Sequence, residues 1–271
     1  MNALEQRMVD ALKDLKENHG VLGVKAEFEA EGTRMEEALR LKEVVTKAGL
    51  DLTIKVGGCE AIRDMYDARS IGVTRIVAPM IETPYALIKF LGATHMVYPQ
   101  DEWDNVDFLI NIETETGYRN LPEMLKVPHI GELAGIVLGR TDMSRSLGLT
   151  ADDINSERVF GIASEALPLA KEHGKECVIG GGVSADSVPF FARLPQGCLD
   201  KFETRKVLFK YPGASEKNMC QGILKAVGFE LMWLKNKQAF YGSIYREDAQ
   251  RIHVLQSRYD KSIEAAGGKY E

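Results

Sequence analysis

The sequence has 271 residues, of which 45% are hydrophobic and 27% are charged, as in an ordinary globular protein. Its formal net charge of −6 argues against the basic surface that a nucleic-acid-binding protein presents. It contains no run of about 18 apolar residues, so we expect no membrane span. The charged N-terminal segment lacks the apolar core of a secretion signal, and we therefore expect a cytoplasmic protein. The four cysteines and five histidines include no Cys-x-x-Cys or His-x-x-x-His pair of the kind that indicates a zinc site.

Apolar segments with strand character alternate with segments of helical period along most of the chain. The predicted strands are 21–28, 51–58, 74–82, 94–100, 106–114, 132–142, 176–184 and 206–210. Helical segments are predicted between most of them, at 34–49, 59–72 and 156–174, and each ends at a glycine. About eight strand–helix units fit a (β/α)8 barrel better than a doubly wound sheet. No Gly-x-Gly-x-x-Gly follows the first strand, which argues against a dinucleotide site.

We expect residues 1–271 to form a single barrel domain that begins with an N-terminal helix and carries a helical extension at 213–271. Two helices are predicted in this extension, at 215–234 and 245–268. The segment 219–233 is rich in Met, Leu, Phe and Trp, and an apolar helix outside a closed barrel must be buried. Burial against a second subunit would make the protein a homo-oligomer, and the alternative is packing against its own barrel.

Polar residues at the C-terminal ends of two predicted strands suggest a metal site, because these ends form the active site of a barrel. The segment FLINIETETGY at 108–118 turns polar at Asn111 and Glu113. The next strand ends in GRTD, which places Asp142 one repeat after Glu113. Neighbouring strands lie about 4.8 Å apart, so the two carboxylates can share one ion. Oxygen ligands without nearby Cys or His favour Mg²⁺ or Mn²⁺. Taken singly, Glu113 could be a solvated strand end and Asp142 a helix cap.

Three segments carry a resemblance to a known family. LINIETETGYRNLPEML, at 109–125, and GIVLGRTDMSRSLG, at 135–148, resemble two consecutive motifs of the HpcH/HpaI aldolase and citrate lyase β-subunit family, in the same order and at the same separation. IVAPMIETPYAL, at 76–87, is similar to the third-strand segment of that family. The resemblance extends over roughly 20–210 and is most specific between 74 and 150.

The resemblance implies a (β/α)8 barrel that forms or breaks carbon–carbon bonds next to a pyruvate enolate, with a divalent metal, Mg²⁺ or Mn²⁺, as cofactor. It makes Glu113 and Asp142 the metal ligands. It also makes Asn111 a residue that faces the substrate, and it assigns the pyruvyl carboxylate to the backbone of the GRTD segment. The backbone groups concerned belong to Gly139, Arg140 and Thr141, where a glycine and consecutive N–H groups suit an anion.

The sequence departs from the family at three positions. Lys55 stands where the family often has an arginine that holds pyruvate, and a lysine gives a looser grip; the alternative is a surface lysine. No His follows the first strand, and Glu27 is the candidate acid or base; the alternative is a salt-bridged strand end. Arg140 replaces a proline and either offers a second cation to an acidic substrate or points to solvent. We further expect Glu82 to orient Lys55 or a metal-bound water, and we consider Arg205 as a contact to a distal acid group.

Three functions remain open on this basis. The first is a metal-dependent lyase that cleaves a 2-keto-3-deoxy acid to pyruvate and an aldehyde, or forms it from them. The second is an enzyme similar to citryl- or malyl-CoA lyases, although no clear Lys and Arg cluster is present for the phosphates of CoA. The third is an inactive protein on an aldolase scaffold, against which the pair Glu113 and Asp142 argues.

Overall fold

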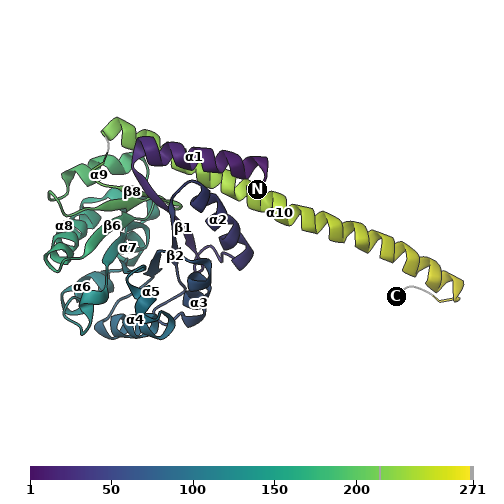
Figure 1. The fold of residues 1–271 in the computed structure, drawn as a ribbon, viewed down its shortest axis with the longest axis horizontal. Coiled ribbons are helices and arrows are strands. Elements are labelled where there is room, and N and C mark those ends of the chain that lie inside the picture. Colours follow the sequence, from purple (N-terminus) through teal and green to yellow (C-terminus); the bar gives the residue numbers. More distant parts are fainter. Residues whose placement is uncertain (214, 269–271) are drawn as a thin grey trace. The chain divides into compact units, whose positions relative to one another are not determined.

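The computed structural model describes residues 1–213 and 215–268. Eight strands close into a barrel in which each strand pairs with its neighbours in chain order (Figure 1). The strands are β1 (Val21–Glu27), β2 (Asp51–Lys55), β3 (Arg75–Ala78), β4 (Asp107–Ile112), β5 (Gly135–Gly139), β6 (Glu176–Gly180), β7 (Lys201–Glu203) and β8 (Val207–Lys210). The closed barrel confirms the predicted fold class.

The last strand runs against the direction of the others. Strands β1 to β7 pair in parallel, whereas β8 is antiparallel to both β7 and β1. A tight turn joins β7 to β8, in which the Thr204 N–H donates to the Val207 carbonyl at 2.9 Å. No helix fits into this turn, so β7 and β8 form a hairpin where an ideal (β/α)8 barrel has a helical crossover.

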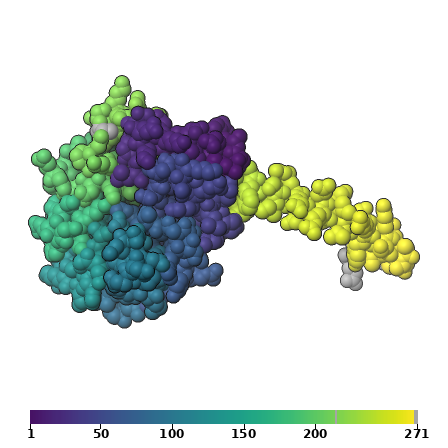
Figure 2. All heavy atoms as spheres, viewed as in Figure 1, coloured from purple at the N-terminus to yellow at the C-terminus, as the bar shows by residue number. Residues whose placement is uncertain are grey.

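Helices surround the strands. The α-helices are α1 (Ala3–His19), α2 (Met35–Lys47), α3 (Ile62–Ile71), α4 (Pro84–Val97), α5 (Gln100–Trp103), α6 (Glu115–Met124), α7 (Arg140–Ser146), α8 (Glu157–Glu172), α9 (Val188–Arg193) and α10 (Glu216–Ala265). The 3-10 helices are η1 (Ile130–Glu132), η2 (Ala151–Asn155) and η3 (Ala185–Ser187). The N-terminal helix α1, in purple, lies beside α2 at the surface (Figure 2), and Arg40 of α2 is 2.5 Å from Glu5 of α1.

Two predicted elements differ from the structure. Residues 94–97 were predicted as part of a strand but belong to α4. The helical period of this segment was not visible because α4 carries apolar residues on more than one face: Phe90 is fully buried, whereas Met96 is 68% exposed. The three-residue strand β7 was not predicted, because its sequence Lys-Phe-Glu is too short to show alternation.

The predicted C-terminal extension includes residues 214 and 269–271, which lie outside the described residues; the described part is helical, as predicted, but its two predicted helices are one. Helix α10 is continuous for 50 residues, because no proline interrupts it between the two predicted segments. The chain divides into two compact units, Met1–Glu230 and Leu231–Glu271, and α10 belongs to both. In the first unit Ile223, Ala226 and Phe229 are buried, so this part of α10 packs on its own barrel. The homo-oligomer stays a prediction. No described helix has the length and apolar character that crossing a membrane requires.

Ion pairs close the barrel at the N-terminal ends of its strands. The guanidinium of Arg75 donates to Glu176 at 2.6 Å and to Asp107 at 2.8 Å. Lys201 donates to the same Glu176 at 2.5 Å. Above this layer, a cluster of buried apolar side chains from the strands fills the barrel interior: Val77, Leu109, Val137, Val178 and Leu208. This apolar layer fills the middle of the barrel and separates the ion pairs from the C-terminal ends of the parallel strands, where barrel enzymes bind their ligands.

Candidate active site

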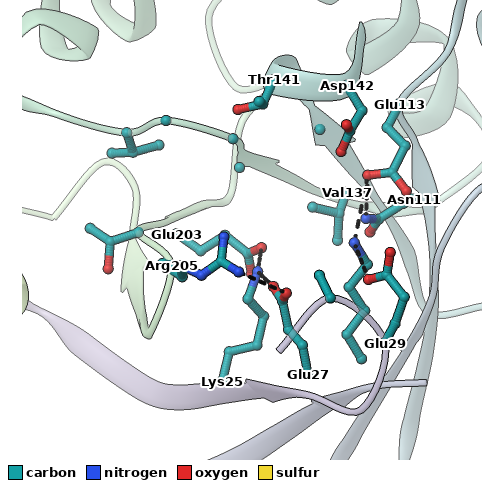
Figure 3. Close-up of a pocket in the computed structure, with 18 of the residues that line it drawn as sticks. Lys25, Glu27, Glu29, Asn111, Glu113, Val137, Thr141, Asp142, Glu203 and Arg205 are labelled. Carbon is teal, nitrogen blue, oxygen red and sulfur yellow. Dashed lines mark hydrogen bonds and ion pairs between the residues drawn. The ribbon is translucent and has the colours of Figure 1, made fainter. Parts of the chain in front are cut away.

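A cavity of about 520 Å³ opens at the C-terminal ends of the parallel strands (Figure 3). Charged side chains dominate its wall, and Val137 lies at its floor. The predicted site residues on this wall are Glu27, Lys55, Asn111, Glu113, Gly139, Thr141 and Asp142. They come from β1, β2, β4, β5 and the segments that follow, so the barrel brings together residues that are far apart in the sequence.

Glu113 follows β4 directly and is 3% exposed. Its Oε1 accepts a hydrogen bond from the Met80 backbone N–H at 3.0 Å, and its Oε2 accepts one from the Asn111 amide at 2.8 Å. Met80 has a positive φ of 51°, which is uncommon for a residue other than glycine. The segment after β3 therefore holds an unusual backbone conformation at the point where it binds the Glu113 carboxylate.

Asp142 lies in the first turn of α7, directly after the neighbouring strand β5. Figure 3 shows its carboxylate directed toward that of Glu113. Burial raises the pKa of Glu113; the charge of Lys55 opposes that shift, and the charge of Asp142 adds to it. Two acidic groups that follow adjacent strands, one of them buried, form a place where a cation would be stabilised.

Asn111 lines the cavity with one unsatisfied oxygen. Its amide nitrogen is engaged with Glu113, but its Oδ1 is buried and has no hydrogen-bond partner among the described residues. A buried acceptor without a partner costs free energy, so a ligand or ion in the cavity would be favoured at this oxygen. Glu113, Asp142 and the Asn111 oxygen are all hard oxygen donors. They fit a divalent cation such as Mg²⁺ or Mn²⁺.

Lys55 is the last residue of β2 and is 7% exposed. Its Nζ lies 3.2 Å from Glu29 Oε2 and 3.8 Å from Glu113 Oε2. The ammonium thus lies beside the proposed metal ligand and on the cavity wall, where a bound anion can reach it.

A second group of charges, built around Lys25, faces the same cavity. Lys25 Nζ donates to Glu203 Oε1 at 2.5 Å and lies 3.2 Å from Glu27 Oε1. Burial lowers the pKa of Lys25, but the two carboxylates outweigh burial and raise it above its usual range. Burial raises the pKa of Glu27, but Lys25, Lys55 and Arg205 outweigh it and hold the carboxyl below its usual range. Glu27 is therefore ionised at neutral pH.

The loop after β6 packs tightly against the start of α7. Gly181 has a positive φ of 78°, and a Cβ on it would lie 2.5 Å from the Thr141 backbone nitrogen. Only glycine allows this approach. Thr141 and Gly139 border the cavity beside this loop. The backbone nitrogens of Arg140 and Thr141, which were expected to hold the pyruvyl carboxylate, lie close to Gly181.

Arg140 and Glu82 do not line the cavity. Arg140 is fully buried and donates to the carbonyls of Gly180 and Gly181, to Asn155 and to Ser187. Burial lowers its pKa to about 10. Its side chain reaches neither the cavity nor solvent, contrary to both expectations, because the β6 loop and the rings of Phe190 and Phe191 in α9 enclose it. Glu82 accepts a hydrogen bond from Thr114 Oγ1 at 2.6 Å, at the start of α6, rather than orienting Lys55.

Sequence reasoning missed several residues of the cavity. Glu203 is the last residue of β7, and we expected no role for it because that strand was not predicted. Met80 carried no signal, since its function lies in its backbone N–H. The glycines at 180–182 were visible in the sequence as Gly-Gly-Gly, but they were included in the predicted strand 176–184, whereas β6 ends at Gly180 and a loop at the cavity follows.

A family model described as HpcH/HpaI aldolase/citrate lyase matches residues 23–188. The chain belongs to this family. The match spans β1 to β6 and includes the Glu113 and Asp142 strand ends. HpcH/HpaI family membership supports a carbon–carbon lyase with small-molecule substrates, and members of the family generally use a divalent metal.

Solved structures share the HpcH/HpaI fold at low sequence identity. A HpcH/HpaI aldolase/citrate lyase family protein from Burkholderia cenocepacia J2315 is 15% identical with a TM-score of 0.58, over 91% of this chain and 100% of that one. The citrate synthase SbnG is 15% identical with a TM-score of 0.55, over 92% and 98%. A HpcH/HpaI aldolase from Desulfitobacterium hafniense DCB-2 is 13% identical with a TM-score of 0.53, over 66% and 85%. No curated protein matches the chain.

Proposed function

We propose that the protein is a metal-dependent aldolase that cleaves or forms a 2-keto-3-deoxy acid through the enolate of pyruvate. One observation carries this proposal: the carboxylates of Glu113 and Asp142 face each other at the ends of adjacent strands, next to the unpaired oxygen of Asn111. Three oxygen donors at one end of a barrel suit a small hard cation. They leave positions free for an oxyanionic substrate.

Glu113, Asp142 and the oxygen of Asn111 would hold the cation, which when bound supplies Lewis-acid stabilisation of the enolate oxygen. Lys55 would pair with the carboxylate of the 2-oxo acid, because its Nζ borders the cavity 3.8 Å from Glu113. The second cluster, around Lys25, would lie on the side of the cavity toward β1 and β7 and meet the remainder of the substrate.

Glu27 is the proposed base. Its Oε1 is 3.2 Å from Lys25 Nζ, whereas its Oε2 has Arg205 at 3.8 Å and is the less tightly held oxygen. We propose that Oε2 accepts the proton that the C4 hydroxyl releases when the C3–C4 bond breaks. Because the carboxyl is ionised at neutral pH, it can accept that proton without a preceding ionisation step.

The charges at the cavity disfavour a CoA ester as substrate. Lys25 and Lys55 are each paired with carboxylates, and Arg205 lies between Glu27 and Glu31. Arg145 lies 3.9 Å from Asp142. Each cation at the cavity thus has an acidic partner, and a set of cations that could bind the phosphates of CoA is not found on the described cavity wall.

The test uses pyruvate alone, since it requires no knowledge of the aldehyde. Metal-free protein is titrated with Mn²⁺ or Mg²⁺ by calorimetry, and exchange of the pyruvate methyl protons in D₂O is followed by NMR. We expect metal binding that pyruvate tightens, and metal-dependent exchange. Glu113→Gln/Asp142→Asn should lose both, while the surface control Asp101→Asn/Glu123→Gln should behave as the wild type. Wild-type protein that binds neither metal nor pyruvate would refute the proposal and favour an inactive scaffold.

A further inference from the structure

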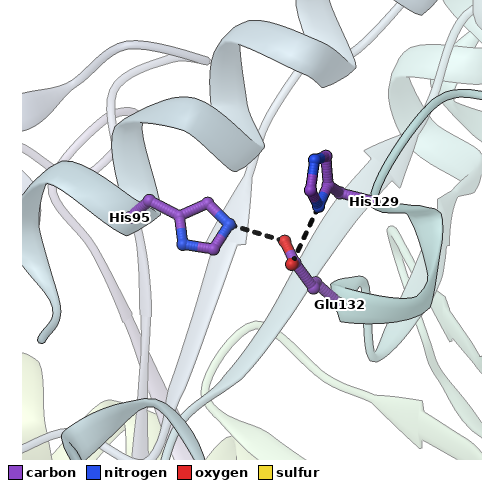
Figure 4. A group of neighbouring side chains, drawn as sticks. All are labelled: His95, His129 and Glu132. Carbon is purple, nitrogen blue, oxygen red and sulfur yellow. Dashed lines mark hydrogen bonds and ion pairs between the residues drawn. The ribbon is translucent and has the colours of Figure 1, made fainter. Parts of the chain in front are cut away.

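Two histidines and a glutamate converge on the opposite face of the barrel, at the N-terminal ends of the strands (Figure 4). His95 lies in the last turn of α4, His129 directly precedes η1, and Glu132 is the last residue of η1, just before β5. His95 Nε2 is 2.7 Å from Glu132 Oε2, and His129 Nδ1 is 3.1 Å from Glu132 Oε1. One ligand atom from each residue lies within 4.8 Å of the other two. The cavity and its carboxylates take no part in this cluster.

The ring of His95 is held in place by its surroundings. It stacks on Trp103 of α5 with ring centroids 4.3 Å apart and an interplanar angle of 16°. The face of the imidazole is thereby covered, while the Nε2 edge points to Glu132. A stacked ring has lost much of its rotational freedom before any ligand arrives, which lowers the entropic cost of binding.

The segment with His129 and Glu132 is also fixed. The buried ammonium of Lys175 donates to the carbonyls of Ile130 and Leu133, at 2.5 and 2.7 Å. The Glu132 N–H donates to the His129 carbonyl at 3.0 Å. His129 itself has a positive φ of 64°, which is uncommon for a residue other than glycine, and its ring is directed toward Glu132 (Figure 4). The ligand atoms are therefore supported by backbone that is anchored on the barrel.

We propose that His95, His129 and Glu132 form a second cation site, separate from the cavity, that binds a borderline divalent transition metal such as Zn²⁺. Two imidazole nitrogens and one carboxylate oxygen are ligands that Zn²⁺, Co²⁺, Ni²⁺ and Cu²⁺ prefer and that Mg²⁺ does not. Bond lengths to zinc of about 2.0–2.2 Å separate tetrahedral ligand atoms by roughly 3.4 Å. The ligand atoms of these side chains lie within 4.8 Å of one another, so small side-chain shifts would bring all three onto one ion. Three protein ligands leave a fourth position for water.

The bound metal would join α4 to the segment that enters β5. It would act as a structural tie, because the site is on the face of the barrel where residues serve stability rather than chemistry. Metal that binds the folded chain and not the unfolded chain stabilises the fold in proportion to its occupancy. This inference does not depend on the proposed aldolase activity, because different variants test the two proposals.

Co²⁺ is the probe, because its visible absorption reports nitrogen ligation and a low coordination number. The protein must carry no polyhistidine tag, since a tag would bind the same ion. Chelator-treated wild type and Glu113→Gln/Asp142→Asn should both take up one Co²⁺ with visible absorption, which Zn²⁺ displaces and excess Mg²⁺ does not. His95→Ala and His129→Asn should each weaken binding by about tenfold or more, since even loss of a residue that only supports a ligand costs that much. The matched control His173→Asn removes an exposed histidine outside the cluster and should bind as the wild type.

A second readout covers variants with altered folding. Zn²⁺ should raise the melting temperature of the wild type and of His173→Asn, but not that of His95→Ala or His129→Asn. The inference is overturned if Co²⁺ gives no such absorption with wild-type protein, or if the two cluster variants bind it as the wild type does. In either case the three side chains form only a hydrogen-bonded group at the surface.

Discussion

Gly139 leaves the space that the carboxylate of Glu113 occupies. A Cβ at Gly139 would lie 2.7 Å from Glu113 Oε2 and 2.8 Å from Glu113 Cβ. The glycine at the end of β5 therefore allows the acidic side chain that follows β4 to enter the barrel mouth. It is this close approach, rather than any backbone conformation, that requires glycine here, since Gly139 has an ordinary φ of −88°.

We predict that Gly139→Ala displaces both the Glu113 carboxylate and the backbone that carries the Glu113 Cβ. A new methyl group at that distance must push the carboxylate away, so Mn²⁺ affinity should fall by about tenfold or more, as for loss of a residue that orients a metal ligand. Calorimetric titration with Mn²⁺ measures this. Gly161→Ala is the matched control, because a Cβ at Gly161 meets nothing within 4 Å. Equal Mn²⁺ affinity in both variants would contradict the assignment of Glu113 as a ligand.

We predict that Lys55→Met weakens pyruvate binding to the metal-loaded protein by roughly 10- to 100-fold, because a hydrogen bond to a charged group contributes about 1.5–3 kcal/mol. The control is Lys126→Met at the surface. If Lys55 holds the carboxylate as a cation, borohydride added with pyruvate should not inactivate the wild type. Covalent trapping of pyruvate on Lys55 would show instead that the lysine forms a Schiff base.

Arg140→Met should destabilise the fold by about 3 kcal/mol, because it leaves buried acceptors on the β6 loop without their donor. Those acceptors are the carbonyls of Gly180 and Gly181. Urea unfolding monitored by circular dichroism gives the free energy of unfolding. Arg63→Met, which removes an arginine that is 90% exposed, should leave it unchanged. A small effect of Arg140→Met would mean that water replaces the guanidinium without cost.

Glu176 should make the stability depend on pH in the acid range. Burial raises the pKa of this carboxyl, but Arg75 and Lys201 outweigh burial and hold it below its ordinary value of 4.5. The folded state therefore binds the proton less tightly than the unfolded state, so the contribution to stability is complete above 4.5 and disappears as the pH falls through the folded-state pKa.

The variant Glu176→Gln tests this sign. It should be less stable than the wild type by about 3 kcal/mol at pH 7, since it leaves Arg75 buried without its main partner. The difference in the free energy of unfolding should shrink as the pH is lowered below 4.5. A difference that stays constant between neutral and acid pH would show that the carboxylate charge does not stabilise the N-terminal face of the barrel.

Local patterns in the sequence predicted those parts of the site that depend on one strand and its end. Glu113 and Asp142 follow strongly apolar segments, and a barrel necessarily brings such strand ends together. The surroundings of Arg140 could not be predicted, because its hydrogen-bond partners are Asn155, the β6 loop and Ser187 of η3, which lie 15 to 47 residues further along the chain. The cluster of His95 and His129 was hidden for the same reason: neither histidine lies in a short-range motif, and only the packing of α4 against the segment before β5 joins them.

The reversed strand β8 has a consequence for how the chain folds during synthesis. In the described part of the chain, β1 and β7 are joined in the sheet only through β8, which ends at Lys210. Until the ribosome has released this segment, the first and seventh strands are both open edges, with unpaired backbone groups able to pair with other chains. We therefore expect nascent chains that stop before Val207 to need protection by chaperones, and release of the last hairpin to end that need in a single closing step.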